Sequence, residues 1–154
     1  PPGSGNLVYE TAINNIVIPA LESFSPDLII LSTGYDAAMM DPLGRMMVTT
    51  EGYSRMTQAL VNAADSLANG KLVVVQEGGY CQYYVPFCGL AVLESLTGAE
   101  SGFTDEYGEI VDGQIRNSFT SEQIQYLCSA YEAHFGKSSP VLASLVPGTS
   151  GGEV

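Results

Sequence analysis

Two apolar runs of β-type sequence each lead into a residue that could take part in chemistry. Asp36 follows "LIILSTGY", and Tyr80 follows "LVVVQEGG". A carboxylate at the end of a buried strand has the fixed direction that a cation ligand needs. A phenol preceded by two glycines can approach a ligand closely and donate its O–H to a developing oxyanion. The two residues are therefore candidates for a cation ligand and an oxyanion donor.

Each candidate also has an ordinary structural explanation. Asp36 could cap a turn or the following helix, and Tyr80 could be a partly buried tyrosine in a turn. Asp41 begins the turn "DPLG", where we expect its carboxylate to accept backbone N–H groups of the loop. Leu43 would project from that loop, as a packing residue or as a wall of a crevice. His134, the sole histidine, has no second ligand at a suitable spacing, which favours a surface position.

The elements that would position these residues follow an α/β pattern. The segments "SPDLIILSTG" and "KLVVVQEGGY" read as strands buried on both faces. A helix between them would follow Thr49 and Thr50 and end at Gly70. Strand, helix, strand, helix predicts a parallel sheet, and ligands of such sheets bind outside the carboxyl ends of the strands. Asp36 and Tyr80 should therefore face one crevice.

Further helices are expected on both sides of this unit. Helical spacing over residues 9–24 is interrupted by Pro19, which should kink or split the helix. Residues 83–98 read as a helix that Gly98 closes. The acidic, weakly periodic segment 99–119 should be a surface loop, residues 120–136 form an amphipathic helix with a capping box, and the tail 137–154 should be irregular.

Composition narrows the class of protein. The 154 residues suffice for one domain, and 45% of them are hydrophobic, which excludes a disordered chain. A net charge of -12 makes nucleic acid an unlikely direct partner. The sequence shows neither an apolar run that could span a membrane nor a signal peptide, and its three cysteines do not suggest a disulfide framework. We therefore expect a cytoplasmic protein, and the opening "PPGSG" suggests a piece of a longer one.

The run "PDLIILSTGYDAAMMDPLGRMMVTTEGY", followed by "VVVQEGGY" and "YVPFCGLAVLESLTG", resembles the histone deacetylase family. The similarity is greatest to bacterial histone deacetylase-like amidohydrolases and acetylpolyamine amidohydrolases, and it covers nearly all of residues 1–98. It implies an open parallel α/β sheet of the arginase-deacetylase type, with zinc at the carboxyl ends of the strands. Residues 1–136 would form the C-terminal portion of the catalytic domain.

The resemblance also implies roles for single residues. Asp36 matches a zinc ligand, and Tyr80 matches the tyrosine that polarises the substrate carbonyl. Gly78 and Gly79 match glycines beside the bound acyl group, and Leu43 matches a leucine that lines the tunnel for the acylated side chain. The implied activity is zinc-dependent removal of acetyl groups from acetyl-lysine or acetylpolyamine-like substrates.

One departure from the family pattern limits this expectation. The family's other two zinc ligands, an aspartate and a histidine, and its histidine pair have no counterpart in this sequence. We expect them in the upstream half of the catalytic domain or in another chain, so this chain alone should be inactive. The alternative is a non-catalytic binding or assembly module with a deacetylase-like fold. A nucleotide-binding domain is disfavoured because "EGGY" lacks the G-x-G-x-x-G spacing.

Overall fold

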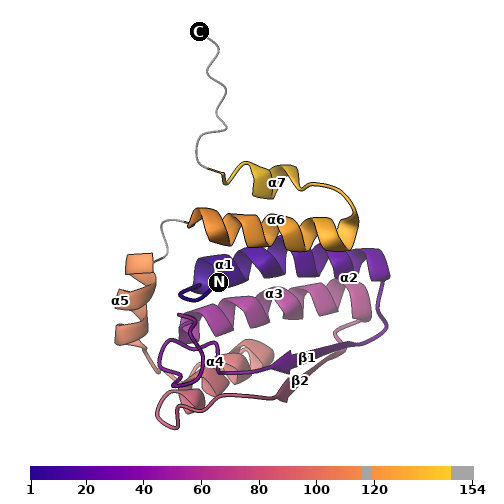
Figure 1. Ribbon diagram of the computed structural model, residues 1–154. Coiled ribbons are helices and arrows are strands. Elements are labelled where there is room, and N and C mark those ends of the chain that lie inside the picture. Colours follow the sequence, from indigo (N-terminus) through magenta and orange to yellow (C-terminus); the bar gives the residue numbers. More distant parts are fainter. Residues whose placement is uncertain (116–118, 147–154) are drawn as a thin grey trace.

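The computed structural model describes residues 1–115 and 119–146, and Figure 1 shows its elements. In chain order these are α1 (Asn6–Ala12), the π-helix η1 (Ile13–Val17), α2 (Ile18–Phe24), β1 (Ile29–Thr33), α3 (Thr50–Ala68), β2 (Leu72–Gln76), α4 (Val85–Thr97), α5 (Glu106–Ile115), α6 (Ser121–Phe135) and α7 (Pro140–Ala143). The two strands pair in parallel, with Ile29 opposite Leu72 and Thr33 opposite Gln76. The predicted α/β order and strand direction are confirmed.

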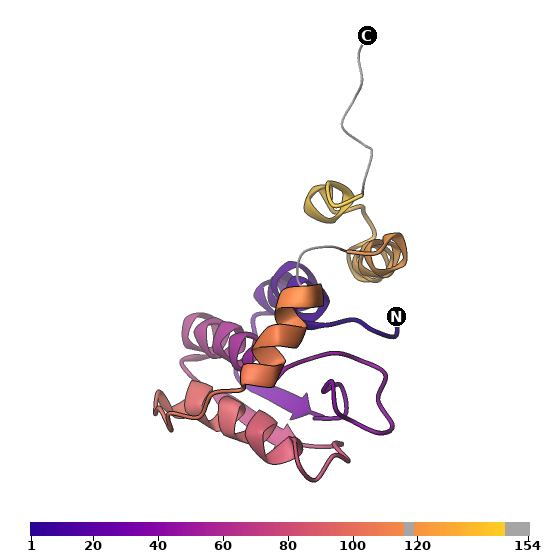
Figure 2. The ribbon, with the colours of Figure 1, turned by 90° about the vertical axis from the view of Figure 1, so that its left-hand side faces the viewer.

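The helices gather on one side of the two strands (Figure 2). On that side Ile29 and Thr33 are buried, because α2 and α3 pack over the inward face of β1. On the other side Ile30 is 63% exposed and Val73 47% exposed. Within the described residues neither strand is therefore buried on both faces, so that expectation is not met by this chain alone. Successive side chains of a strand point to opposite faces, and only one face of this sheet is covered.

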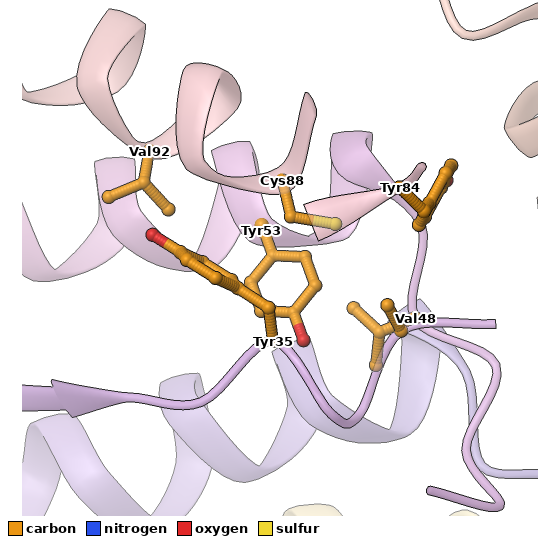
Figure 3. Packing of buried hydrophobic residues seen from close by; sticks show 7 residues of the cluster. Tyr35, Val48, Tyr53, Tyr84, Cys88 and Val92 are labelled. Atoms are coloured by element: carbon orange, nitrogen blue, oxygen red, sulfur yellow. The ribbon is translucent and has the colours of Figure 1, made fainter. Parts of the chain in front are cut away.

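A hydrophobic cluster lies directly behind the carboxyl ends of the strands (Figure 3). The rings of Tyr35 and Tyr53 pack edge to face, with centroids 5.3 Å apart. Cys88 and Val48 are fully buried in the same cluster. Burial, with smaller contributions from nearby acidic groups, raises the pKa of Cys88 to about 12, so the thiol stays neutral. This cluster supports the loops that carry the candidate residues.

Helix boundaries follow the proline and glycine signals with small differences. The π-helix η1 ends two residues before Pro19, and the residues that flank it keep right-handed helical angles, so the first helix widens before the proline and is not split. A proline removes one backbone donor and collides with the preceding turn, and a widened turn relieves that collision. At the end of α3, Asn69 takes the left-handed conformation that we expected of Gly70, and Gly70 follows with positive φ as well.

The segment expected to be an acidic surface loop contains helix α5, so that prediction is wrong. Asp105 precedes the helix and accepts the backbone N–H of Gly108 at 2.8 Å. Glu106 and Glu109 lie in the first turn, where negative charge is favourable to the helix dipole. Capping and charge therefore stabilise a helix that the weak hydrophobic periodicity of this segment does not indicate.

The last elements confirm one prediction and correct another. Helix α6 carries the predicted capping box, in which Thr120 and Gln123 bond reciprocally. The tail is not wholly irregular, because α7 forms within it and Leu142 is buried. Residues 116–118 and 147–154 lie outside the described part of the chain. Among the helices that are described, none is both long and apolar enough to cross a membrane.

Candidate functional site

The carboxylate of Asp36 lies in a frame of glycines just beyond β1. A Cβ atom on Gly34 would lie 2.7 Å from Oδ1 of Asp36, and one on Gly78 would overlap Oδ2. A side chain at either position would therefore displace the Asp36 carboxylate. The frame brings backbone from the ends of both strands against the same carboxylate, which is partly buried.

Tyr80 reaches the same place from the end of β2. The Cβ position on Gly78 that overlaps Asp36 lies 3.4 Å from the phenol oxygen of Tyr80. The carboxylate of Asp36 and the phenol oxygen of Tyr80 therefore lie on the same side of Gly78. The side chain of Tyr80 is 57% exposed, which leaves its phenol open to a ligand.

Backbone contacts hold the two strand ends together. The N–H of Tyr35 donates to the carbonyl of Gly78 at 2.8 Å, and the N–H of Glu77 donates to the carbonyl of Thr33 at 3.0 Å. Gly79 has φ of +128°, and a Cβ there would lie 2.8 Å from Cβ of Tyr35. The two glycines before Tyr80 thus allow this turn to pass close against the end of β1.

Asp41 connects the loop of residues 41–44 to Tyr80. Its Oδ1 accepts the backbone N–H groups of Leu43 and Gly44, both at 2.8 Å. Its Oδ2 accepts the backbone N–H of Tyr80 at 2.7 Å. Burial alone would raise the pKa of Asp41, but backbone N–H groups, including those of Gly44, Tyr80 and Leu43, outweigh it and lower the pKa. The bonds within the loop confirm our expectation, whereas the bond to Tyr80 was not anticipated.

Leu43 projects from this loop to the surface. A Cβ on Gly44 would overlap the backbone carbonyl oxygen of Asp36, so the loop lies directly against the residue that carries the candidate ligand. The side chain of Leu43 is 69% exposed. Of its two expected roles, packing within the chain is therefore disfavoured by the described residues.

The buried Tyr53 and the partly buried Tyr9, both near Asp36, were not singled out from the sequence. Tyr53 donates its O–H to the backbone carbonyl of Gly34 at 3.1 Å. This bond helps to fix the backbone of Gly34 beside Asp36. Burial raises the pKa of Tyr9 and of Tyr53, and the nearby charge of Asp36 adds to both shifts. Both phenols therefore stay neutral. Their helical spacing in the sequence indicated core positions and gave no sign of contact with the strand ends.

The chain offers one carboxylate to a metal at this place. Within residues 1–115 and 119–146, no group of three or more His, Cys, Asp and Glu side chains could hold a metal ion. His134 lies exposed in the last turn of α6, with its ring against that of Phe135. The surface position expected for this histidine is confirmed.

Known proteins are similar to this chain in sequence. A family model described as "Histone deacetylase domain" matches residues 1–96. The histone deacetylase-like amidohydrolase of Pseudomonas aeruginosa is 41% identical over 134 residues, which cover 84% of this chain and 35% of that protein. Histone deacetylase 8 of Arabidopsis thaliana is 41% identical over 96 residues, covering 62% of this chain and 26% of that protein.

Solved structures give the same result. The HD domain of HDA15 superposes with a TM-score of 0.59 and 34% identity, over 89% of this chain and 37% of that one. The histone deacetylase Clr3 superposes with a TM-score of 0.59 and 32% identity, over 82% and 21%. The match thus covers between 21% and 37% of the length of these proteins. Because the family model matches well over half of its residues, this chain belongs to the histone deacetylase family.

Proposed function

We propose that Asp36 and Tyr80 belong to the site of a zinc-dependent amidohydrolase that removes acetyl groups from acetyl-lysine or acetylpolyamine-like substrates. The observation that carries the proposal is that the Asp36 carboxylate and the Tyr80 phenol oxygen lie on the same side of Gly78. Family membership supports a deacetylase or amidohydrolase. The match covers only 35% of the length of the bacterial relative. The proposal therefore concerns the full-length protein and not this chain alone.

Asp36 fits the role of one zinc ligand. Its carboxylate is held between Gly34 and Gly78 and remains partly accessible from the crevice. Zinc, when bound, would polarise the acetyl carbonyl and lower the pKa of its bound water. A catalytic zinc site takes three protein ligands, so we propose that the other two come from outside the described residues.

Tyr80 would act on the opposite side of the substrate carbonyl. Its O–H would donate to the carbonyl oxygen, and this bond would strengthen as the oxygen gains negative charge. Gly78, where a Cβ would lie 3.4 Å from the phenol oxygen, would leave room there for the small acyl group, whereas a Cβ on Gly79 would face Tyr35 and Val85. Leu43, exposed at the rim, would pack against the methylene groups of a long, slender acylated side chain.

The test is Tyr80→Phe in the full-length protein, because this change removes only the phenol O–H. We expect kcat for an acetyl-lysine peptide to fall by about 10² to 10³, since one oxyanion donor is lost. Zinc content, measured by elemental analysis, should stay unchanged. The matched control is Tyr83→Phe, since Tyr83 lies three residues further on and is 76% exposed.

Two results would contradict the proposal. Unchanged turnover in Tyr80→Phe would remove the role given to the phenol. Absence of hydrolysis by the unmodified full-length protein, with both an acetyl-lysine peptide and an acetylpolyamine, would favour a non-catalytic binding module with a deacetylase-like fold.

A further inference from the structure

We infer that Asp41 is a positioning residue that holds Tyr80 in its working orientation and ties it to the loop of Leu43. The inference rests on the proposed function, because it assumes that the Tyr80 phenol meets a substrate carbonyl. Asp41 itself touches no reacting atom. It acts through the backbone N–H of Tyr80, which its Oδ2 accepts at 2.7 Å.

Tyr80 needs such an anchor because little else fixes its side chain. Tyr80 is 57% exposed, so packing within the described residues contributes only part of its orientation. The two residues before it are glycines, which have the widest backbone freedom of all residues. The orientation of the phenol therefore depends on how firmly the backbone at Tyr80 is held. The bond to Asp41 holds the backbone at that residue.

The other oxygen of Asp41 organises the facing loop. Oδ1 accepts the N–H groups of Leu43 and Gly44, and the residue as a whole is only 8% exposed. Hydrogen bonds from N–H groups to a carboxylate are about twice as strong as those between neutral groups. One buried carboxylate thus fixes the distance between the proposed tunnel wall at Leu43 and the proposed oxyanion donor at Tyr80.

The chemistry of the site requires an acid at this position. Three N–H groups converge on the two oxygens of Asp41, so both ends of the side chain must accept. An asparagine has nearly the same shape but offers one oxygen and one NH₂ group. In either orientation its NH₂ group would face an N–H donor, and at least one of the two loops would lose its anchor.

The first measurement is the kinetics of Asp41→Asn in the full-length protein. We expect kcat to fall about 10- to 100-fold, because small displacements of a catalytic group are costly. Zinc content should be unchanged, since the ligand Asp36 is untouched. The matched control is Asp27→Asn, the same change at an exposed residue before β1, at the opposite end of the strand. This control should retain the activity of the unmodified protein.

A double-mutant cycle separates positioning from a general structural role. If Asp41 acts through the phenol of Tyr80, then Asp41→Asn should lower kcat little further in a Tyr80→Phe background. If the two effects on kcat multiply, Asp41 acts independently of the phenol and the inference is overturned. A loss confined to KM would overturn it as well.

Backbone hydrogen exchange tests the linkage without reference to activity. In the unmodified protein, the amide of Tyr80 should exchange slowly although its side chain is exposed, and Asp41→Asn should accelerate exchange at Leu43, Gly44 and Tyr80 together. Fast exchange at Tyr80 in the unmodified protein would overturn the inference even if the variant failed to fold. A protein that hydrolyses no acetylated substrate but shows this protection would refute the proposed function and leave the linkage standing.

Discussion

The strand-end loops and helix α5 are attached to the fold in different ways. Around Asp36 the chain approaches itself so closely that a single added carbon at Gly44 or Gly78 would overlap other atoms. Helix α5 is instead attached by side chains, since Asp105 accepts the O–H of Tyr84 and the O–H of Thr50. The first region specifies geometry and tolerates no added volume. The second depends on polar contacts, so its changes should alter stability more than geometry.

The comparisons with relatives divide the chain at about the same place. The family model ends at residue 96, near the end of α4. The bacterial amidohydrolase matches 84% of the chain, so its similarity extends into the C-terminal helices. The closely packed strand-end region therefore lies within the part common to the family, and the region attached by side chains lies beyond it.

The difference between the two regions is tested most directly by making the same substitution in both. Gly78→Ala places a Cβ on the Asp36 carboxylate and close to the Tyr80 phenol. We expect kcat/KM for an acetyl-lysine peptide to fall about 100-fold or more, because ligand and donor are both displaced. The control is Gly113→Ala in α5, where a Cβ would meet nothing within 4 Å.

The control should keep full activity and gain about 0.5 to 1 kcal/mol of stability, because alanine is the better helix former. Steady-state kinetics and urea unfolding of the full-length protein measure both effects. Equal losses of activity in the two variants would show that the regions do not differ as described.

A second substitution tests the attachment of α5. Tyr84→Phe removes an O–H that donates to Asp105, and the backbone N–H of Thr50 loses its acceptor. Tyr84 is 5% exposed, so we expect unfolding to become easier by about 1 to 3 kcal/mol, the usual cost of unpaired buried polar groups. Hydrogen exchange should accelerate over residues 99–115 more than around Asp36.

Tyr126→Phe serves as the control for Tyr84→Phe, because Tyr126 is 62% exposed on α6. It should leave the free energy of unfolding within about 0.5 kcal/mol of the unmodified value. If Tyr84→Phe abolished activity without affecting exchange in α5, its phenol would belong to the site and the attachment role would be contradicted.

The smallest expected effect is a pH dependence from Asp41. Its pKa in the folded protein lies below the ordinary value of 3.8, so the unfolded chain takes up a proton first as the pH falls. The stabilisation by this carboxylate is complete above that ordinary value and is lost as the pH falls through the folded pKa. Urea unfolding measured between about pH 3 and pH 6 should therefore show a steeper acid loss in the unmodified protein than in Asp41→Asn. Parallel curves would contradict this contribution.

The sequence predicted the parts of the site that depend on local pattern. Apolar runs ending in Asp36 and in the glycines before Tyr80 were sufficient to place both residues at one edge of a parallel sheet, because the geometry of such sheets is regular. The contact of Asp41 with Tyr80 could not be predicted in this way. The two residues are 39 positions apart, and the partner of a loop carboxylate depends on which backbone approaches it in the folded chain.

Two errors have a similar origin. The apolar residues at Ile30 and Val73 predicted strands covered on both sides, but composition shows what a face prefers and not which layers cover it. Helix α5 was missed because its glycines and acids obscure the helical period. A signal was present, since Asp105 followed by Glu106 and Glu109 is typical of a capped helix start with favourable charge.

The crossover from β1 through α3 to β2 also determines when the site can form during folding. Closing the chain between Asp41 and Tyr80, 39 positions apart, costs about 3 kcal/mol of loop-closure entropy before any contact compensates it. Non-local contacts of this kind form slowly compared with single helices. A folding intermediate that contains α3 but lacks the pairing of β1 with β2 would hold Asp36 and Tyr80 apart. We therefore expect the site to form together with the parallel pair of strands.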